Sequence, residues 1–123
     1  MKTDVDSGNA TVGLSIDTDD EVMIDDVTFE GEVTGDKATT RGVETVSGKA
    51  PSVTVTNSTF NNEGNGIYLN QIASGEISDN VFNENIDDLG IGFGKNINEN
   101  DVTIENNDFL NDNPDFQEIE FSE

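Results

Sequence analysis

The chain has 123 residues, of which 32% are hydrophobic, and its 27 acidic residues against five basic ones give a formal net charge of −22. Nucleic acids and anionic membranes attract clusters of Lys and Arg, so this balance argues against both as partners. The same acidity is typical of a solvated, salt-adapted surface, and we expect a halophilic source.

The length fits one domain or a piece of a larger protein. The sequence has no apolar run long enough to span a bilayer and no signal peptide behind Met1. Localisation is therefore not indicated by the chain alone. As part of a larger protein, it would be extracellular or on a cell surface.

Two regions follow from the polarity of the chain. Residues 1–11 are polar and predict a loose N-terminal lead-in, and residues 12–123 predict one repeat domain. Within that domain, residues 12–16 alternate apolar with small or polar side chains, which predicts a short strand. An acidic turn follows at residues 17–21.

An eight-residue pattern ending in Phe then occurs four times, at residues 22–29, 53–60, 75–82 and 102–109. Its first and third positions are apolar, apart from Gly75, as in a strand with one buried face. Two polar residues come next, and inward-facing positions resume at the sixth and eighth. Each copy is therefore predicted to form two short strands joined by a corner.

A second pattern, Gly followed by an aliphatic residue, comes after each loop. The aliphatic residue lies at 14, 43, 67, 91 and 119, and the last copy has lost its glycine. No 3.6-residue apolar stripe is present, so helices are not expected. Each repeat is too short to bury its own apolar face, and consecutive copies must stack.

Together, V-x-I-x-N-N-x-F and G-I-x-L resemble the right-handed parallel β-helix repeat of pectate-lyase-like proteins, over residues 12–121. The resemblance implies an all-β fold, a short right-handed parallel β-helix (β-solenoid) of about four to five coils that is part of a longer one. Each strand would pair in parallel with its counterpart about 4.8 Å away. The four Phe residues would form one column, and Asn80 would lie directly over Asn107.

The fifth position of the eight-residue pattern alternates acid and amide. It holds Asp26, Asn57, Asp79 and Asn106. In stacked coils this alternation would keep the carboxylates about 9.6 Å apart and reduce their repulsion.

Enzymes of the family that the chain resembles cleave acidic polysaccharides, with Asp-bound calcium and a basic residue or with clustered aspartates. This sequence has no histidine, and its only arginine, Arg41, is expected in a long loop. Asp87 and Asp88 resemble the paired aspartates of the hydrolase subgroup, but the motifs that should follow are absent. We therefore predict no catalytic residue. A fragment of a polysaccharide lyase or glycoside hydrolase is the alternative.

A candidate ligand site lies on the second pattern. Tyr68, the lone tyrosine, takes an outward position with Gly92 above it and Glu44 below it in the same column. An exposed ring beside glycine could support a sugar ring, and the carboxylate could accept its hydroxyls. The sequence therefore favours a structural or carbohydrate-binding module, with polysaccharide or glycan as the partner.

Two further expectations concern metals and the ends of the array. No cofactor is expected, although the acidic stretches 4–8 and 17–21 faintly resemble calcium loops and keep a calcium-dependent adhesion module as a third interpretation. No amphipathic helix is available to cap either end of the stack. Open coil ends are therefore expected to pair with a neighbouring domain or chain, which favours a fragment of a longer protein.

Overall fold

The computed structural model describes residues 11–31, 40–61, 65–83, 89–110 and 117–122. Their strands form three sheets in which every pairing is parallel. The first sheet contains β1 (Thr11–Ile16), β4 (Thr40–Thr45), β7 (Asn65–Leu69), β10 (Leu89–Phe93) and β13 (Gln117–Phe121). The second contains β2 (Glu21–Asp25), β5 (Ser52–Thr56), β8 (Ser74–Ser78) and β11 (Val102–Glu105). The third contains β3 (Thr28–Glu30), β6 (Thr59–Asn61), β9 (Val81–Asn83) and β12 (Asp108–Leu110).

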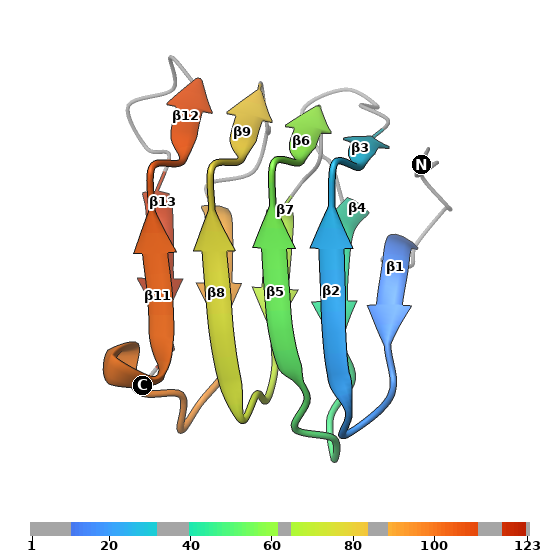
Figure 1. The fold of residues 1–123 in the computed structure, drawn as a ribbon, viewed down its shortest axis with the longest axis vertical. Coiled ribbons are helices and arrows are strands. Elements are labelled where there is room, and N and C mark those ends of the chain that lie inside the picture. Colours follow the sequence, from blue (N-terminus) through green and yellow to red (C-terminus); the bar gives the residue numbers. More distant parts are fainter. Residues whose placement is uncertain (1–10, 32–39, 62–64, 84–88, 111–116, 123) are drawn as a thin grey trace.

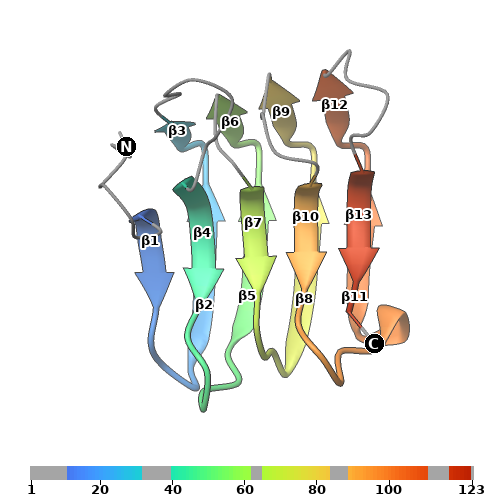
Figure 2. The same cartoon turned by 180° about the vertical axis from the view of Figure 1, so that it is seen from behind.

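The chain winds as a parallel β-helix. Figure 1 shows the second sheet in front, with each strand continuing around a corner into a short strand of the third sheet. The first sheet forms the opposite wall, as Figure 2 shows from behind. The three sheets contain five, four and four strands. This confirms the predicted short β-solenoid, and the number of coils is close to the predicted four to five.

The predicted lead-in lies almost wholly outside the described residues, and β1 begins at Thr11. One 3-10 turn, η1 (Glu99–Asp101), precedes β11. Within the described ranges, no helix is long and apolar enough to cross a membrane.

The corner between the second and third sheets is made by the fifth residue of the eight-residue pattern. The four residues there have positive φ angles between 51° and 59°: Asp26, Asn57, Asp79 and Asn106. This left-handed conformation is costly for most residues and is best tolerated by Gly, Asn and Asp. Backbone geometry therefore limits this column to acids and amides, a stricter reason than the spacing of charges.

A column of stacked Phe rings, formed by the eighth position of the pattern, runs through the core. Phe29, Phe60 and Phe82 are at most 1% exposed, and consecutive rings are 4.8 and 4.9 Å apart at their centroids and nearly parallel. Phe109 continues this column at 4.8 Å. The predicted Phe column is therefore confirmed. Its spacing follows from the distance between parallel strands.

Glycine is required beside this column. A Cβ on Gly42, Gly66 or Gly90 would come within 2.6–2.8 Å of the Phe ring of the next coil. Cβ atoms do not approach other heavy atoms so closely, so a larger residue would push the ring out of the stack. The two sequence patterns are thus coupled, because the Gly of one coil makes space for the Phe of the next.

The sixth position forms a ladder of polar side chains inside the corner. The Asn80 amide donates to Asn107 Oδ1 at 3.1 Å and to the Val55 carbonyl at 2.9 Å. Its own Oδ1 accepts the Ser58 N–H at 2.9 Å. The predicted placement of Asn80 over Asn107 is confirmed, and each amide satisfies backbone groups of neighbouring coils.

Candidate functional site

The structure aligns the predicted site residues across the first sheet. Glu44 of β4 pairs with Tyr68 of β7, and Tyr68 pairs with Gly92 of β10, in the order expected from the repeats. Tyr68 and Glu44 are both half-buried, whereas Gly92 is buried. Because residue 92 is glycine, no side chain stands beside Tyr68 at the next position of the column.

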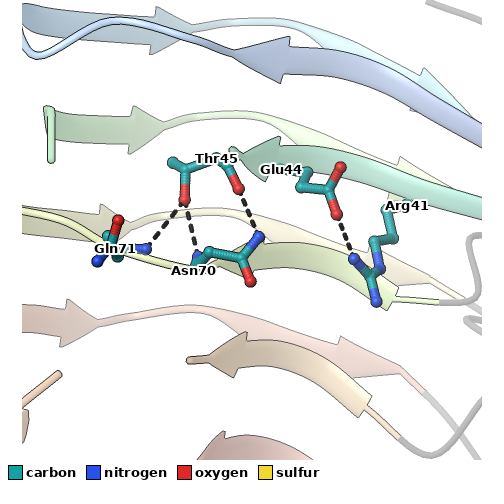
Figure 3. A network of polar contacts seen from close by, with 5 residues as sticks. All are labelled: Arg41, Glu44, Thr45, Asn70 and Gln71. Atoms are coloured by element: carbon teal, nitrogen blue, oxygen red, sulfur yellow. Dashed lines mark hydrogen bonds and ion pairs between the residues drawn. The ribbon is translucent and has the colours of Figure 1, made fainter. Parts of the chain in front are cut away.

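Arg41 corrects one expectation from the sequence. It lies in strand β4 and not in a long loop. Its guanidinium carbon lies 4.4 Å from the centroid of the Tyr68 ring, and the same group forms an ion pair with Glu44. Figure 3 shows the Arg41–Glu44 contact. A guanidinium on an aromatic face is a favourable cation–π arrangement. Glu44 is thus engaged by Arg41.

An open depression of about 350 Å³ borders Tyr68. It lies beside the turns that follow β7 and β10. Its lining is mostly polar: Ser47, Tyr68, Asn70, Gln71, Gly94, Lys95, Asn96 and Ser122. Glu44 is not among these residues. Tyr68 therefore borders the depression, while Arg41 and Glu44 are not part of its lining.

Thr45 holds two residues of this lining in place. Its side chain is fully buried, and its Oγ1 accepts the backbone N–H of Asn70 at 2.7 Å and that of Gln71 at 3.4 Å. The Asn70 amide donates back to the Thr45 carbonyl at 2.5 Å (Figure 3). Thr45 stands where the other copies of the second pattern have an apolar residue, and its hydroxyl supplies the acceptor that the turn after β7 uses.

The depression offers both donors and acceptors of hydrogen bonds. Primary amides donate through nitrogen and accept through oxygen, and the Lys95 ammonium donates. Asn96 has a φ of 70°, which turns the chain sharply beside the depression. Sequence reasoning identified Tyr68 but not Asn70, Gln71 or Lys95. Their only signal was the polar run after each Gly–aliphatic strand.

The other acidic candidates are placed as follows. Asp87, Asp88 and residues 4–8 lie outside the described residues. In the acidic turn 17–21, Asp19 accepts the Ala50 N–H at 2.9 Å and lies 3.9 Å from the Lys49 ammonium, so its carboxylate fastens the turn of the next coil. Among the described residues, no group of three or more His, Cys, Asp or Glu side chains could hold a metal ion.

Comparison with known proteins agrees with the fold. The pattern of the family described as "Right handed beta helix region" matches residues 6–119, nearly the whole chain. No curated protein and no solved structure shows significant similarity to this chain. The parallel coils, the Phe column and the corner residues are the features through which this chain forms such a helix. The chain belongs to the right-handed β-helix family.

Proposed function

We propose that the chain is a non-catalytic β-helix module, part of a salt-adapted surface protein, that binds a carbohydrate in the depression beside Tyr68. One observation carries the proposal: a tyrosine and several asparagine and glutamine residues line the same open depression. Sugars present apolar C–H faces that pack on aromatic rings. Their hydroxyls both donate and accept hydrogen bonds, as do primary amides.

The roles of the residues predicted from sequence change within this proposal. Glu44 acts through Arg41, which it holds over the Tyr68 ring, and does not itself accept sugar hydroxyls. Tyr68 supplies the edge and the uncovered part of its ring. The Asn70 amide is fixed on the Thr45 carbonyl, and the Gln71 Oε1 accepts the Gly48 N–H at 2.6 Å, so little conformational entropy is lost when these side chains bind a ligand.

A glycan panel tests the proposal. The full chain is tested for binding to neutral and acidic oligosaccharides at high salt. Salt at this concentration weakens the repulsion between the acidic chain and acidic sugars. Tyr68→Ala should lose most of the binding, and Tyr68→Phe should retain the part that depends on the ring. Lys95→Gln, within the depression, should weaken binding, whereas Lys49→Gln, outside it, is the matched control and should not.

The alternatives give different results in the same assays. A polysaccharide lyase or hydrolase fragment would release new reducing ends or unsaturated sugars from a bound polymer. A calcium-dependent adhesion module would unfold at a higher temperature in the presence of calcium, because a ligand that binds the native state stabilises it. Binding to no glycan, with no such changes, would leave a purely structural module and contradict the carbohydrate proposal.

A further inference from the structure

The corner residue Asn57 begins an acceptor sequence for N-linked glycosylation. Such a sequence is Asn, any residue except proline, and then Ser or Thr. The chain contains it at residues 9–11 and at residues 57–59. Residue 9 lies outside the described residues, whereas Asn57 lies in the corner between β5 and β6. Asn57 is therefore the acceptor whose surroundings the structure describes.

The corner presents Asn57 to solvent. Its φ of 51° places it in the left-handed region, and the residue is exposed, whereas Ser58 beside it is only 1% exposed. The corner residues of the adjacent coils, Asp26 and Asp79, are exposed as well and have short side chains. An attached oligosaccharide is bulky and needs a surface position. The corner at Asn57 provides one, with no large side chain at the same position of either neighbouring coil.

Backbone hydrogen bonds hold this corner from both sides. The Thr59 N–H donates to the Val27 carbonyl of one neighbouring coil at 3.0 Å. The Ser58 carbonyl accepts the Val81 N–H of the other neighbouring coil at 2.9 Å. These bonds involve no atom of the Asn57 side chain, so a substituent on its amide leaves them intact.

The amide nitrogen of Asn57 can carry a sugar and keep its own contact. Nδ2 donates to Asp25 Oδ1 at 2.9 Å. A primary amide nitrogen has two hydrogens, and this bond uses one of them. An N-linked sugar replaces one hydrogen, and the other still serves Asp25. Modification and the hydrogen bond are therefore compatible.

The four corners differ in whether they supply both groups that the modification requires. Aspartate occupies the corners at positions 26 and 79, which therefore lack the amide. Asn106 has the amide and a φ of 56°, but the second residue after it is Asp108, which has no hydroxyl. Asn57, followed at the second place by Thr59, has both. The acceptor sequence is thus complete at one of four corners of the same geometry.

The corner also lies away from the depression beside Tyr68. Figure 2 shows the corner between β5 and β6 at the upper end of the molecule and the turn after β7 at the lower end. The depression is lined by residues of the turns that follow β7 and β10. An oligosaccharide at the corner leaves that depression accessible.

We infer that Asn57 is the attachment site of an N-linked oligosaccharide. The donor is an oligosaccharide joined through its anomeric carbon to the phosphate of a lipid carrier. A bond forms between Asn57 Nδ2 and this carbon, and the bond from the carbon to the phosphate oxygen breaks. Nδ2 loses one proton, and the lipid phosphate leaves with the bonding electrons. The inference rests on the surface location in the proposed function, because exported chains receive this modification, and not on sugar binding.

Mass spectrometry of peptides tests the inference. The full chain, with Asn9→Gln to remove the other acceptor sequence, is directed into the secretory pathway of a host that has an oligosaccharyltransferase and its lipid-linked donor. The peptide containing residue 57 should carry the oligosaccharide, and Asn57→Gln and Thr59→Val should each abolish the modification. The same peptide should be modified in the chain purified from the cells that naturally make it.

Asn106 provides the matched control. It should stay unmodified in the parent chain, and Asp108→Thr should make it a second acceptor, because this change supplies the missing hydroxyl. An Asn106 that stays unmodified in that variant would contradict the role given to the corner.

Circular dichroism and the glycan panel complete the test. The glycosylated chain should keep its β-sheet spectrum, and Asn57→Gln should bind the panel as the parent does, so that this inference and the proposed function can fail separately. The inference is overturned if residue 57 is unmodified in either preparation, if modification persists in Thr59→Val, or if the glycosylated chain loses its fold.

Discussion

At the scale of single residues, the repeats are kept in place by side chains that satisfy turns. Thr45 is the clearest case, because one buried hydroxyl serves two backbone donors of the next coil. An apolar residue of the same shape fills the space but leaves these N–H groups without a partner. Thr at position 45, in place of the apolar residue of the other copies, therefore stabilises the fold.

Thr45→Val should lower the free energy of unfolding by about 1–3 kcal/mol, the cost of leaving a buried donor unsatisfied. The variant should also weaken the binding of any ligand in the neighbouring depression, since the backbone N–H groups of Asn70 and Gln71 lose the hydroxyl that accepts their hydrogen bonds. Thr54→Val, on the half-buried outer face of β5, is the matched control and should change stability little. Denaturant titration of both variants provides the measurement. Equal stability of the two would contradict the role given to Thr45.

Asp25 makes a prediction about pH. Hydrogen bonds from Asn57, at 2.9 Å, and from Thr56, at 2.7 Å, lower the pKa of the Asp25 carboxyl from its ordinary value of 3.8. Because the folded pKa is the lower one, this stabilisation is present above pH 3.8 and is lost as the pH falls through the lowered value. Asn57→Gly keeps the left-handed backbone but removes the amide donor, so it should raise the pKa of Asp25. Side-chain NMR titration decides this, and an unchanged pKa would show that Asn57 has no such effect.

At the scale of elements, the first and third sheets are linked by the Gly–Phe contact. Gly42, Gly66 and Gly90 each lie against the Phe of the next coil, so a change in one strand is felt in the coil above it. The spacing between the two patterns along the chain varies, yet this contact recurs. It is therefore a property of the winding and not of the loop between the strands.

Gly66→Ala should destabilise the protein by about 1–3 kcal/mol, because the new Cβ would lie 2.6 Å from the Phe82 ring and force it out of the stack. Phe82→Leu in the same chain should relieve part of that cost, so that the double variant is less destabilised than the sum of the two single variants. Gly75→Ala is a fair comparison, since its nearest neighbours are the side chains of Ile72 and Val102 at 3.2 Å or more. Additive effects in the cycle would rule out the Gly66–Phe82 contact as the cause.

At the scale of the whole molecule, the net charge of −22 sets how stability depends on salt. Within the described strands, no paired position places two acidic side chains side by side, so the repulsion that opposes folding comes from the summed charge of the surface. Added salt shortens the Debye length from about 10 Å at 0.1 M to about 3 Å at 1 M. A protein adapted to salt should therefore be more stable at 1 M than at 0.1 M salt.

We expect the unfolding midpoint to rise with NaCl over this range. Asn106→Asp places a second carboxylate one strand away from Asp79 while keeping a residue that tolerates the left-handed corner. This variant should therefore be less stable than the parent chain at low salt and nearly equal to it at 1 M, which thermal denaturation at both salt concentrations can measure. A deficit that salt does not reduce would point to backbone strain and not to charge.

Much of the fold was predictable because it is written as a local pattern. The Phe at the eighth position, the apolar first and third positions and the Asn80–Asn107 pair each required only that consecutive copies stack. The position of Tyr68 between Glu44 and Gly92 followed from the same register. The depression beside Tyr68 was not predictable, because Ser47, Gln71, Asn96 and Ser122 meet there from separate turns whose geometry depends on loops of different lengths.

The sequence by itself determined that consecutive repeats stack, since each is too short to bury its own apolar face, and the resemblance of the repeats to β-helix repeats implied parallel coils. The tertiary structure alone decided the roles of individual side chains. It placed Arg41 over Tyr68, buried Thr45 beneath a turn, and put the corner residues in the left-handed region. Those outcomes depend on contacts between coils about 25 residues apart, which the order of residues along the chain does not specify.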